Sequence, residues 1–189
     1  MSRLSNEDRR ALIEIARRAI VSAVTGERPP ELSPIVGALA ECCGAFVSLH
    51  RGEQLRGCVG QIESLESLAE TVQQVAINST LQDFRFRPVS SDEVRELVIE
   101  ISVLSPLETI QPERIVAGVH GLLVTRHPYR GLLLPQVAAE REWTAERFLE
   151  ETCAKAGLPR DAWRDSSTRI FAFTAEVFSE TDVRAASRL

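Results

Sequence analysis

The segment Leu97-Val98-Ile99-Glu100-Ile101-Ser102-Val103-Leu104 decides the fold, because its β-branched residues are typical of a central strand. Before it, residues 45–49 and 55–59 have the apolar character of two further strands. The polar stretch 50–53 between them predicts a turn, so the second strand is expected to return beside the first. This region therefore predicts a sheet built from hairpins.

The pattern of apolar residues also predicts helices and further strands on both sides of this region. Apolar residues at three- and four-residue spacing predict three helices: one capped by Ser5 or Asn6 and ended by Gly26, one over 67–79, and one capped by Thr144 and ended by Gly157. Further strands are expected over 121–125, 131–135 and 170–178. Hairpins outnumber strand–helix–strand units, so the chain is predicted to be an α+β protein, with a largely antiparallel sheet and flanking helices.

Length and composition exclude several classes of protein. A chain of 189 residues predicts about one domain, and 44% hydrophobic with 26% charged residues is ordinary globular usage. The net charge of −5 argues against a broad nucleic-acid footprint, which needs a basic face. No run of roughly 18 apolar residues and no signal-peptide core is present, so we expect a cytoplasmic protein without a membrane segment.

The cysteine pattern gives no metal site. The four cysteines are Cys42, Cys43, Cys58 and Cys153. None forms a C-x-x-C pair, and the three histidines are scattered, so we expect free thiols and neither a bound metal nor a cofactor.

The stretch Leu55-Arg56-Gly57-Cys58-Val59-Gly60 is the unusual feature, because it places a thiol between two glycines. Glycine weakens a strand unless the backbone bends or another group approaches closely. The arginine and the N-terminus of the next helix would favour a thiolate or a small anion, which predicts a reactive cysteine or an anion pocket. The alternative is a small core cysteine whose neighbouring glycines serve packing.

This hexapeptide resembles the Leu-Arg-Gly-Cys-Ile-Gly signature of the AMMECR family (AMMECR-one domain proteins). Other stretches that resemble the family follow in order: Asp83-Phe84-Arg85-Phe86-Arg87-Pro88, 101–105, Gly118-Val119-His120-Gly121, and 133–138 with Glu140 and Trp143. Together they extend from the first helix to Phe178. Phe84 replaces the family's proline, so the backbone of this loop is expected to differ from that of the family.

The resemblance implies a fold more than a reaction. It implies a single AMMECR-type domain over residues 1–180, compact and with a larger and a smaller lobe, followed by a flexible tail over 181–189. It also implies a cleft between the lobes near the Leu55–Gly60 motif. In prokaryotes such domains accompany a Memo-like protein and a radical S-adenosylmethionine enzyme, which are therefore the partners expected here.

The candidate site residues divide into two groups. The catalytic candidates are Cys58 as nucleophile and His120 as proton acceptor, with Arg56 lowering the pKa of the thiol. The candidates for binding are Arg56, Gly57, Gly60, Arg85 and Glu140. Each has a structural alternative: a histidine in a turn, an arginine that ties down its loop, and a solvated acid at a helix edge.

Two classes of function follow from these residues. The first is a cysteine-dependent enzyme with a cleft around the hexapeptide. The second is a non-catalytic binding or adaptor module working with the Memo-like protein and the radical enzyme. Either would take a small molecule or a peptide as ligand, act as a monomer or homodimer, and have no nucleic-acid partner.

Overall fold

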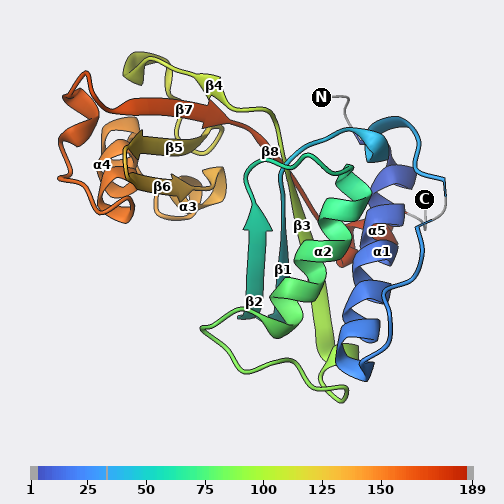
Figure 1. Cartoon of the computed structure of the whole chain (residues 1–189). Coiled ribbons are helices and arrows are strands. Elements are labelled where there is room, and N and C mark those ends of the chain that lie inside the picture. Colours follow the sequence, from blue (N-terminus) through green and yellow to red (C-terminus); the bar gives the residue numbers. More distant parts are fainter. Residues whose placement is uncertain (1–3, 33, 187–189) are drawn as a thin grey trace. The chain divides into compact units, whose positions relative to one another are not determined.

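The computed structural model describes residues 4–32 and 34–186, and the chain divides into two compact units. The first unit comprises residues 1–104 and 176–189, and the second comprises residues 105–175. Each contains its own four-stranded antiparallel sheet with helices beside it (Figure 1). The predicted α+β class is confirmed.

The sheet of the first unit has the strand order β2-β1-β3-β8. Its strands are β1 (Ala45–Arg51), β2 (Gln54–Gln61), β3 (Leu97–Leu104) and β8 (Ala175–Ser179). Val47 of β1 pairs with Val59 on one side and with Ile101 on the other. The predicted hairpin and the central strand over 97–104 are therefore confirmed.

Three helices of the first unit begin and end where local signals require. They are α1 (Asn6–Thr25), α2 (Leu68–Leu81) and α5 (Glu180–Ala186). Ser5 and Ser67 form capping boxes that start α1 and α2, because each side chain accepts a hydrogen bond from a first-turn N–H. Gly26, at a φ of 73°, ends α1 in the left-handed conformation that glycine adopts at little cost.

The two faces of this sheet differ. Along β1, buried residues alternate with half-buried ones, as expected when successive side chains point to opposite faces. Ala45, Val47 and Leu49 belong to the core that α1, α2 and α5 share. Phe46 and Ser48 point to the other face, which we call the open face of the first sheet.

The second unit repeats this plan at smaller size. Its sheet has the order β4-β7-β5-β6 and consists of β4 (Glu108–Thr109), β7 (Arg169–Phe173), β5 (Gly121–Arg126) and β6 (Tyr129–Leu133). Helices α3 (Pro135–Glu140) and α4 (Ala145–Lys155) contribute to its core, where Phe148 is fully buried. Thr144 caps α4 as predicted.

The described residues also form short 3-10 turns in both units: Gly37–Ala40, Val94–Glu96, Pro112–Arg114 and Ala162–Arg164.

The strand predicted over 170–178 is wrong as a single element. It is two strands, β7 in the second sheet and β8 in the first, separated at Thr174. Thr174 donates its N–H to Ser105 Oγ, and its carbonyl accepts the Ser105 N–H, both at 2.9 Å. These bonds satisfy the backbone at the point where the chain leaves one sheet for the other.

Two other boundaries differ from expectation. The strand predicted over 131–135 ends at Leu133, because Pro135 has no N–H for a ladder and starts α3 instead. Residues 181–186, assigned above to a tail, belong to α5, whose Val183 is buried in the core of the first unit. Residues 187–189 of that tail lie outside the described residues.

Candidate functional site

Cys58 lies in the middle of β2, half-buried on the open face of the first sheet. Ser48 is its register partner on β1, and the Ser48 hydroxyl donates to Cys58 Sγ at 3.3 Å. Glu100 of β3 is the register partner of Ser48 on the opposite side. Cys58, Ser48 and Glu100 therefore form one cross-strand row on this face.

The backbone of Cys58 is held from outside the sheet by an ion pair. β2 is an edge strand, so its outward N–H and C=O groups have no neighbouring strand. Asp83 Oδ2 accepts the Cys58 N–H at 2.8 Å, and Arg85 Nη2 donates to the Cys58 carbonyl at 3.1 Å. Because Asp83 and Arg85 also bond to each other at 2.6 Å, the pair takes the place of a strand at this residue.

The ion pair of this clamp shifts the pKa values of both its residues. The Asp83 carboxylate is 4% exposed, and the Arg85 guanidinium holds its pKa far below the usual range. Asp83 is also the main cause of the raised pKa of Arg85. The clamp therefore holds the guanidinium of Arg85 at the backbone carbonyl of Cys58, at 3.1 Å.

Arg56 has a different set of partners from the one expected. Its Nε and Nη2 atoms bond to the Glu93 carboxylate at 2.9 and 3.1 Å, and Nη1 donates to the Arg87 carbonyl at 2.8 Å. The pKa of Glu93 is lowered to about 2, first of all by this hydrogen bond from Arg56. These bonds tie the loop after α2 to β2, whereas the arginine that contacts residue 58 is Arg85, at the backbone carbonyl.

Both glycines of the hexapeptide are accounted for by packing. A Cβ on Gly57 would lie 2.3 Å from the backbone oxygen of Ser79 in α2, and one on Gly60 would lie 2.3 Å from the Phe46 ring. The Ser79 hydroxyl also enters the β1–β2 ladder, where it accepts the Val59 N–H at 2.9 Å. A role of these glycines in ligand binding remains a prediction.

His120 and Glu140 belong to the second unit, whereas Cys58 belongs to the first. His120 Nδ1 accepts the Val116 N–H at 3.1 Å, so in the neutral ring the proton resides on Nε2. His120 also lines a hollow of about 340 Å³ with Arg114. Glu140 is the exposed last residue of α3. Their roles toward Cys58 remain predictions.

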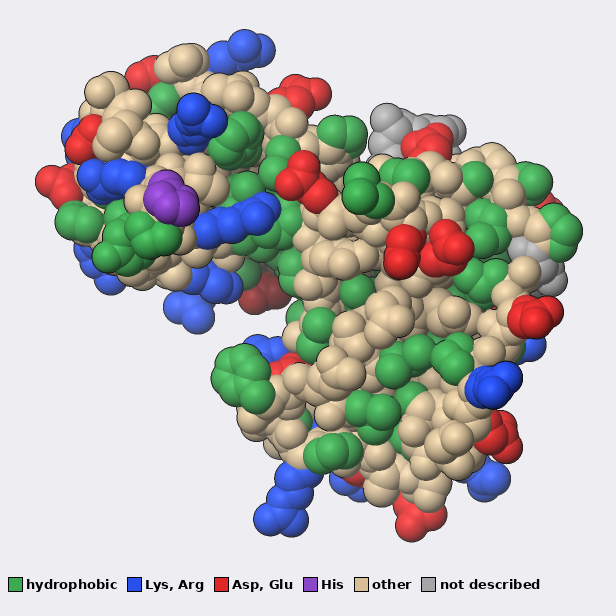
Figure 2. Space-filling model, viewed as in Figure 1, with side chains coloured by type: hydrophobic (Ala, Val, Ile, Leu, Met, Phe, Trp, Pro, Cys, Tyr) green, Lys and Arg blue, Asp and Glu red, His purple; other side chains and the backbone are tan. Residues whose placement is uncertain are grey.

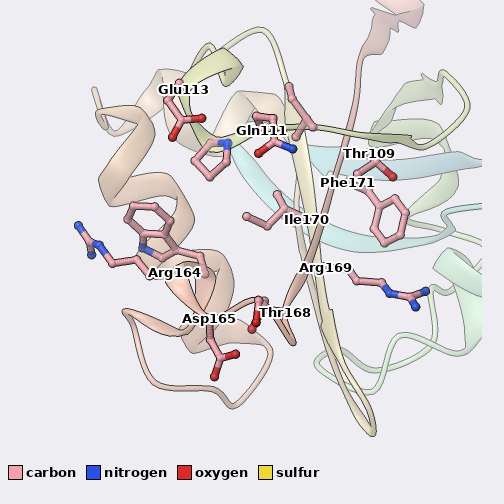
Figure 3. A pocket seen from close by; sticks show the side chains of 13 residues that line it. Thr109, Gln111, Glu113, Arg164, Asp165, Thr168, Arg169, Ile170 and Phe171 are labelled. Carbon is pink, nitrogen blue, oxygen red and sulfur yellow. The ribbon is translucent and has the colours of Figure 1, made fainter.

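A hollow of about 730 Å³ also lies in the second unit and contains none of the predicted site residues (Figure 3). Its lining includes Glu113, Arg164 and Asp165, and two of its polar atoms, Trp163 Nε1 and Thr168 Oγ1, are buried without a hydrogen-bond partner. Among residues 4–32 and 34–186, no three potential ligands from His, Cys, Asp and Glu come together as a metal site. Within the same ranges, no helix has both the length and the apolar character to cross a bilayer.

Three residues of the Cys58 site were missed by reasoning from the sequence: Ser48, Asp83 and Glu100. Asp83 stands in the motif that points to Arg85, but its carboxylate matters only because β2 is an edge strand. Ser48 and Glu100 follow from the hairpin register, which a β-bulge between Leu49 and His50 shifts. No local sequence signal gives that register.

The fold and the site together define an α+β protein of two units with a partly accessible, arginine-flanked thiol on one sheet. The sequence model of the AMMECR1 family matches residues 13–178, so the chain belongs to the AMMECR1 family. Protein TK0174 of Thermococcus kodakarensis is 41% identical over 194 residues, covering 95% of this chain and 94% of that protein. A Methanothermobacter thermautotrophicus protein is 40% identical over 185 residues, covering 94% and 96%.

A solved structure is similar to this chain over most of its length. The crystal structure of the uncharacterised protein PH0010 from Pyrococcus horikoshii has a TM-score of 0.84 and 42% sequence identity. The match covers 92% of this chain and 91% of the other. The same fold is therefore present in both proteins.

Proposed function

We propose that the protein is a cysteine-dependent enzyme whose nucleophile is Cys58. The observation that carries this is a partly accessible thiol whose sulfur accepts a hydrogen bond from the Ser48 hydroxyl at 3.3 Å, while the Arg85 guanidinium donates to the carbonyl of the same residue at 3.1 Å. A cation and a hydrogen-bond donor both stabilise a thiolate, which is the reactive form of cysteine. Asp83 holds Arg85 and the backbone of Cys58 in one arrangement, so the thiol is positioned before a substrate arrives.

The chemistry would be a nucleophilic displacement at an electrophilic carbon of a small molecule or peptide. The Cys58 sulfur forms a bond to that carbon, the bond to the leaving group breaks, and the leaving group takes the thiol proton. Water then attacks the carbon, the C–S bond breaks, the hydroxyl of the water stays on the carbon, and the other proton of the water goes to the sulfur. Glu100 lies across the row, two strand spacings or roughly 10 Å from Cys58, and could exchange protons with a substrate placed over Ser48.

Iodoacetamide labelling tests the nucleophile within one molecule, because the chain provides its own reference thiol. Cys42 is exposed, whereas Cys43 and Cys153 are buried. We expect Cys58 to be labelled at least about tenfold faster than Cys42 at pH 7, with the difference narrowing toward pH 9, as followed by mass spectrometry of the separated peptides. Labelling in denaturant supplies the intrinsic reactivity of each thiol.

Two variants give that experiment its control. Arg85→Gln should bring the labelling rate of Cys58 down to near that of Cys42. Arg87→Gln makes the same charge change two residues away, on an exposed side chain, and should leave the labelling rate of Cys58 unchanged. Circular dichroism checks that both variants are folded. Labelling of Cys58 at the rate of Cys42, or complete protection of Cys58, would refute the proposed nucleophile.

A second candidate function is a binding module that works with a Memo-like protein and a radical S-adenosylmethionine enzyme in the cytoplasm. The observation that favours it is Phe84, which is 96% exposed in the loop beside the Asp83–Arg85 clamp. Exposed aromatic side chains are typical anchors of protein interfaces. Co-purification of the partners with the Phe84→Ala variant tests it, and the Leu65→Ala variant is the equally exposed control. Loss of partner binding in Phe84→Ala, with binding retained in Leu65→Ala, supports the binding module.

A further inference from the structure

A second hollow of the second unit has a chemistry of its own. It encloses about 520 Å³ at the turn between β5 and β6, and its lining includes Thr125, Arg126, His127, Arg130 and Arg169. None of the described residues that line it is acidic. It shares no residue with the Cys58 site, which belongs to the first unit.

Strand register brings the basic side chains together. Thr125 of β5 pairs with Arg130 of β6 on one side and with Arg169 of β7 on the other. Register partners point to the same face, so the three side chains form one row across the sheet, with the hydroxyl between two guanidinium groups. The two arginines are two strand spacings apart, roughly 10 Å, a distance their long side chains can close around one ligand.

One arginine of this hollow has a carboxylate partner. Arg126 Nη1 contacts Asp165 Oδ2 at 3.1 Å, and that carboxylate is also occupied by the N–H and hydroxyl of Ser167. Figure 3 shows Arg169 extending away from Asp165 and Arg164. The second unit has nine basic and nine acidic residues, and three of the basic ones line this hollow. Figure 2 shows Lys and Arg side chains around a histidine on this unit.

We propose that this hollow binds a phosphate dianion, free or as a phosphate monoester of a small molecule. Arg130 and Arg169 would donate to its oxygens from both sides, and the Thr125 hydroxyl would donate from between them. Guanidinium groups match phosphate geometry and form short, charge-assisted hydrogen bonds to it. Two guanidinium groups and a hydroxyl in one row offer more donors than the two oxygens of a carboxylate accept, which favours phosphate. The volume leaves room for the rest of a small monoester.

Phosphate binding can be measured directly on the full chain. Inorganic phosphate and phenyl phosphate are titrated separately at low ionic strength, with phosphorus NMR line width and thermal stability as readouts. We expect saturable binding of at least one probe, and about tenfold weaker binding in Arg130→Gln and in Arg169→Gln, since each loses a charge-assisted pair. Binding of both probes alike assigns the site to the phosphate alone, and tighter binding of phenyl phosphate assigns it to a monoester.

The matched control is Arg141→Gln, an exposed arginine of the same unit that stacks on Trp143 and lies outside this lining. It makes the same change in net charge and should leave binding unaltered. No saturation by either probe up to about 10 mM would overturn the proposal. Equal weakening in Arg141→Gln would overturn it as well.

Discussion

Gly57→Ala tests whether the hexapeptide's first glycine exists for packing. In the structure the new Cβ would lie 2.3 Å from the Ser79 carbonyl oxygen, about 1 Å inside ordinary contact distance. The opposing atom belongs to the backbone of α2, so no side-chain rotation relieves the overlap. The strand cannot shift freely either, because the Asp83–Arg85 clamp holds the N–H and the carbonyl of Cys58.

The magnitude follows from two opposing terms. Forcing a methyl group into a packed site costs about 3 kcal/mol at the upper end of the usual range. Replacing glycine by alanine in a strand stabilises the folded state by about 0.5–1 kcal/mol, because alanine loses less conformational entropy on folding. We therefore expect Gly57→Ala to lower the free energy of unfolding by about 2 kcal/mol, or the midpoint of thermal unfolding by roughly 4–8 °C.

Two spectroscopic probes separate the units in this assay. Both tryptophans, Trp143 and Trp163, belong to the second unit, whereas far-ultraviolet circular dichroism reports helices and strands of both. Urea unfolding followed by both probes shows whether the loss is confined to the first unit. Gly52→Ala is the control, since its Cβ meets nothing within 4 Å and only its φ of 59° is unfavourable, at about 1 kcal/mol.

The reasoning is refuted if Gly57→Ala destabilises no more than Gly52→Ala. The short Cβ–oxygen distance would then be relieved at negligible cost, and packing would not explain the glycine. If the same variant also slowed iodoacetamide labelling of Cys58 without loss of stability, Gly57 would instead serve the reacting partner. A variant that fails to fold supports packing.

Three further predictions concern stability. Glu93→Gln should lower the free energy of unfolding by about 1–2 kcal/mol at pH 7. The shift in the pKa of Glu93 from 4.5 to about 2 sets an upper limit of ~3 kcal/mol, and the partial exposure of the ion pair with Arg56 reduces it. Because the folded-state pKa is the lower one, this stabilisation is complete above pH 4.5 and is lost as pH falls toward 2, so urea midpoints of variant and wild type should converge in acid. Ser79→Ala should leave the Val59 N–H without its acceptor, costing about 1–3 kcal/mol and accelerating hydrogen exchange at that amide. Phe148→Ala should cost about 3–5 kcal/mol, measured by urea unfolding, and should change the fluorescence of Trp143, whose ring lies 6.5 Å away.

The elements that could be predicted from the sequence are those with local causes. The β-branched run over 97–104 becomes β3 with the same limits, and Ser67 starts α2 through the capping box that its spacing to Glu70 predicts. A cap depends on bonds between residues three positions apart, so neighbouring letters contain it. The same holds for Gly26, which only has to adopt a positive φ.

The elements that could not be predicted depend on contacts distant in sequence. Residues 170–178 read as one strand, and only the pairing of Thr174 with Ser105, 69 positions away, divides them between two sheets. The Asp83–Arg85 clamp likewise requires knowing that β2 is an edge strand. The residues next to Cys58 in the sequence point to its thiol as a candidate. Its partners on the open face, Ser48 and Glu100, are placed beside it by strand pairing, which the sequence does not show.

The structural explanations for the hexapeptide do not extend to its sulfur atom. Arg56 holds a loop carboxylate, and Gly57 and Gly60 give room to a helix and a ring. The clamp at position 58 uses only the N–H and the carbonyl, which every residue except proline supplies. A serine would fit the clamp equally well, so backbone anchoring gives no reason for a thiol. Under the proposed function, what distinguishes cysteine at position 58 is the chemistry of its sulfur on the open face, where it accepts a hydrogen bond from Ser48.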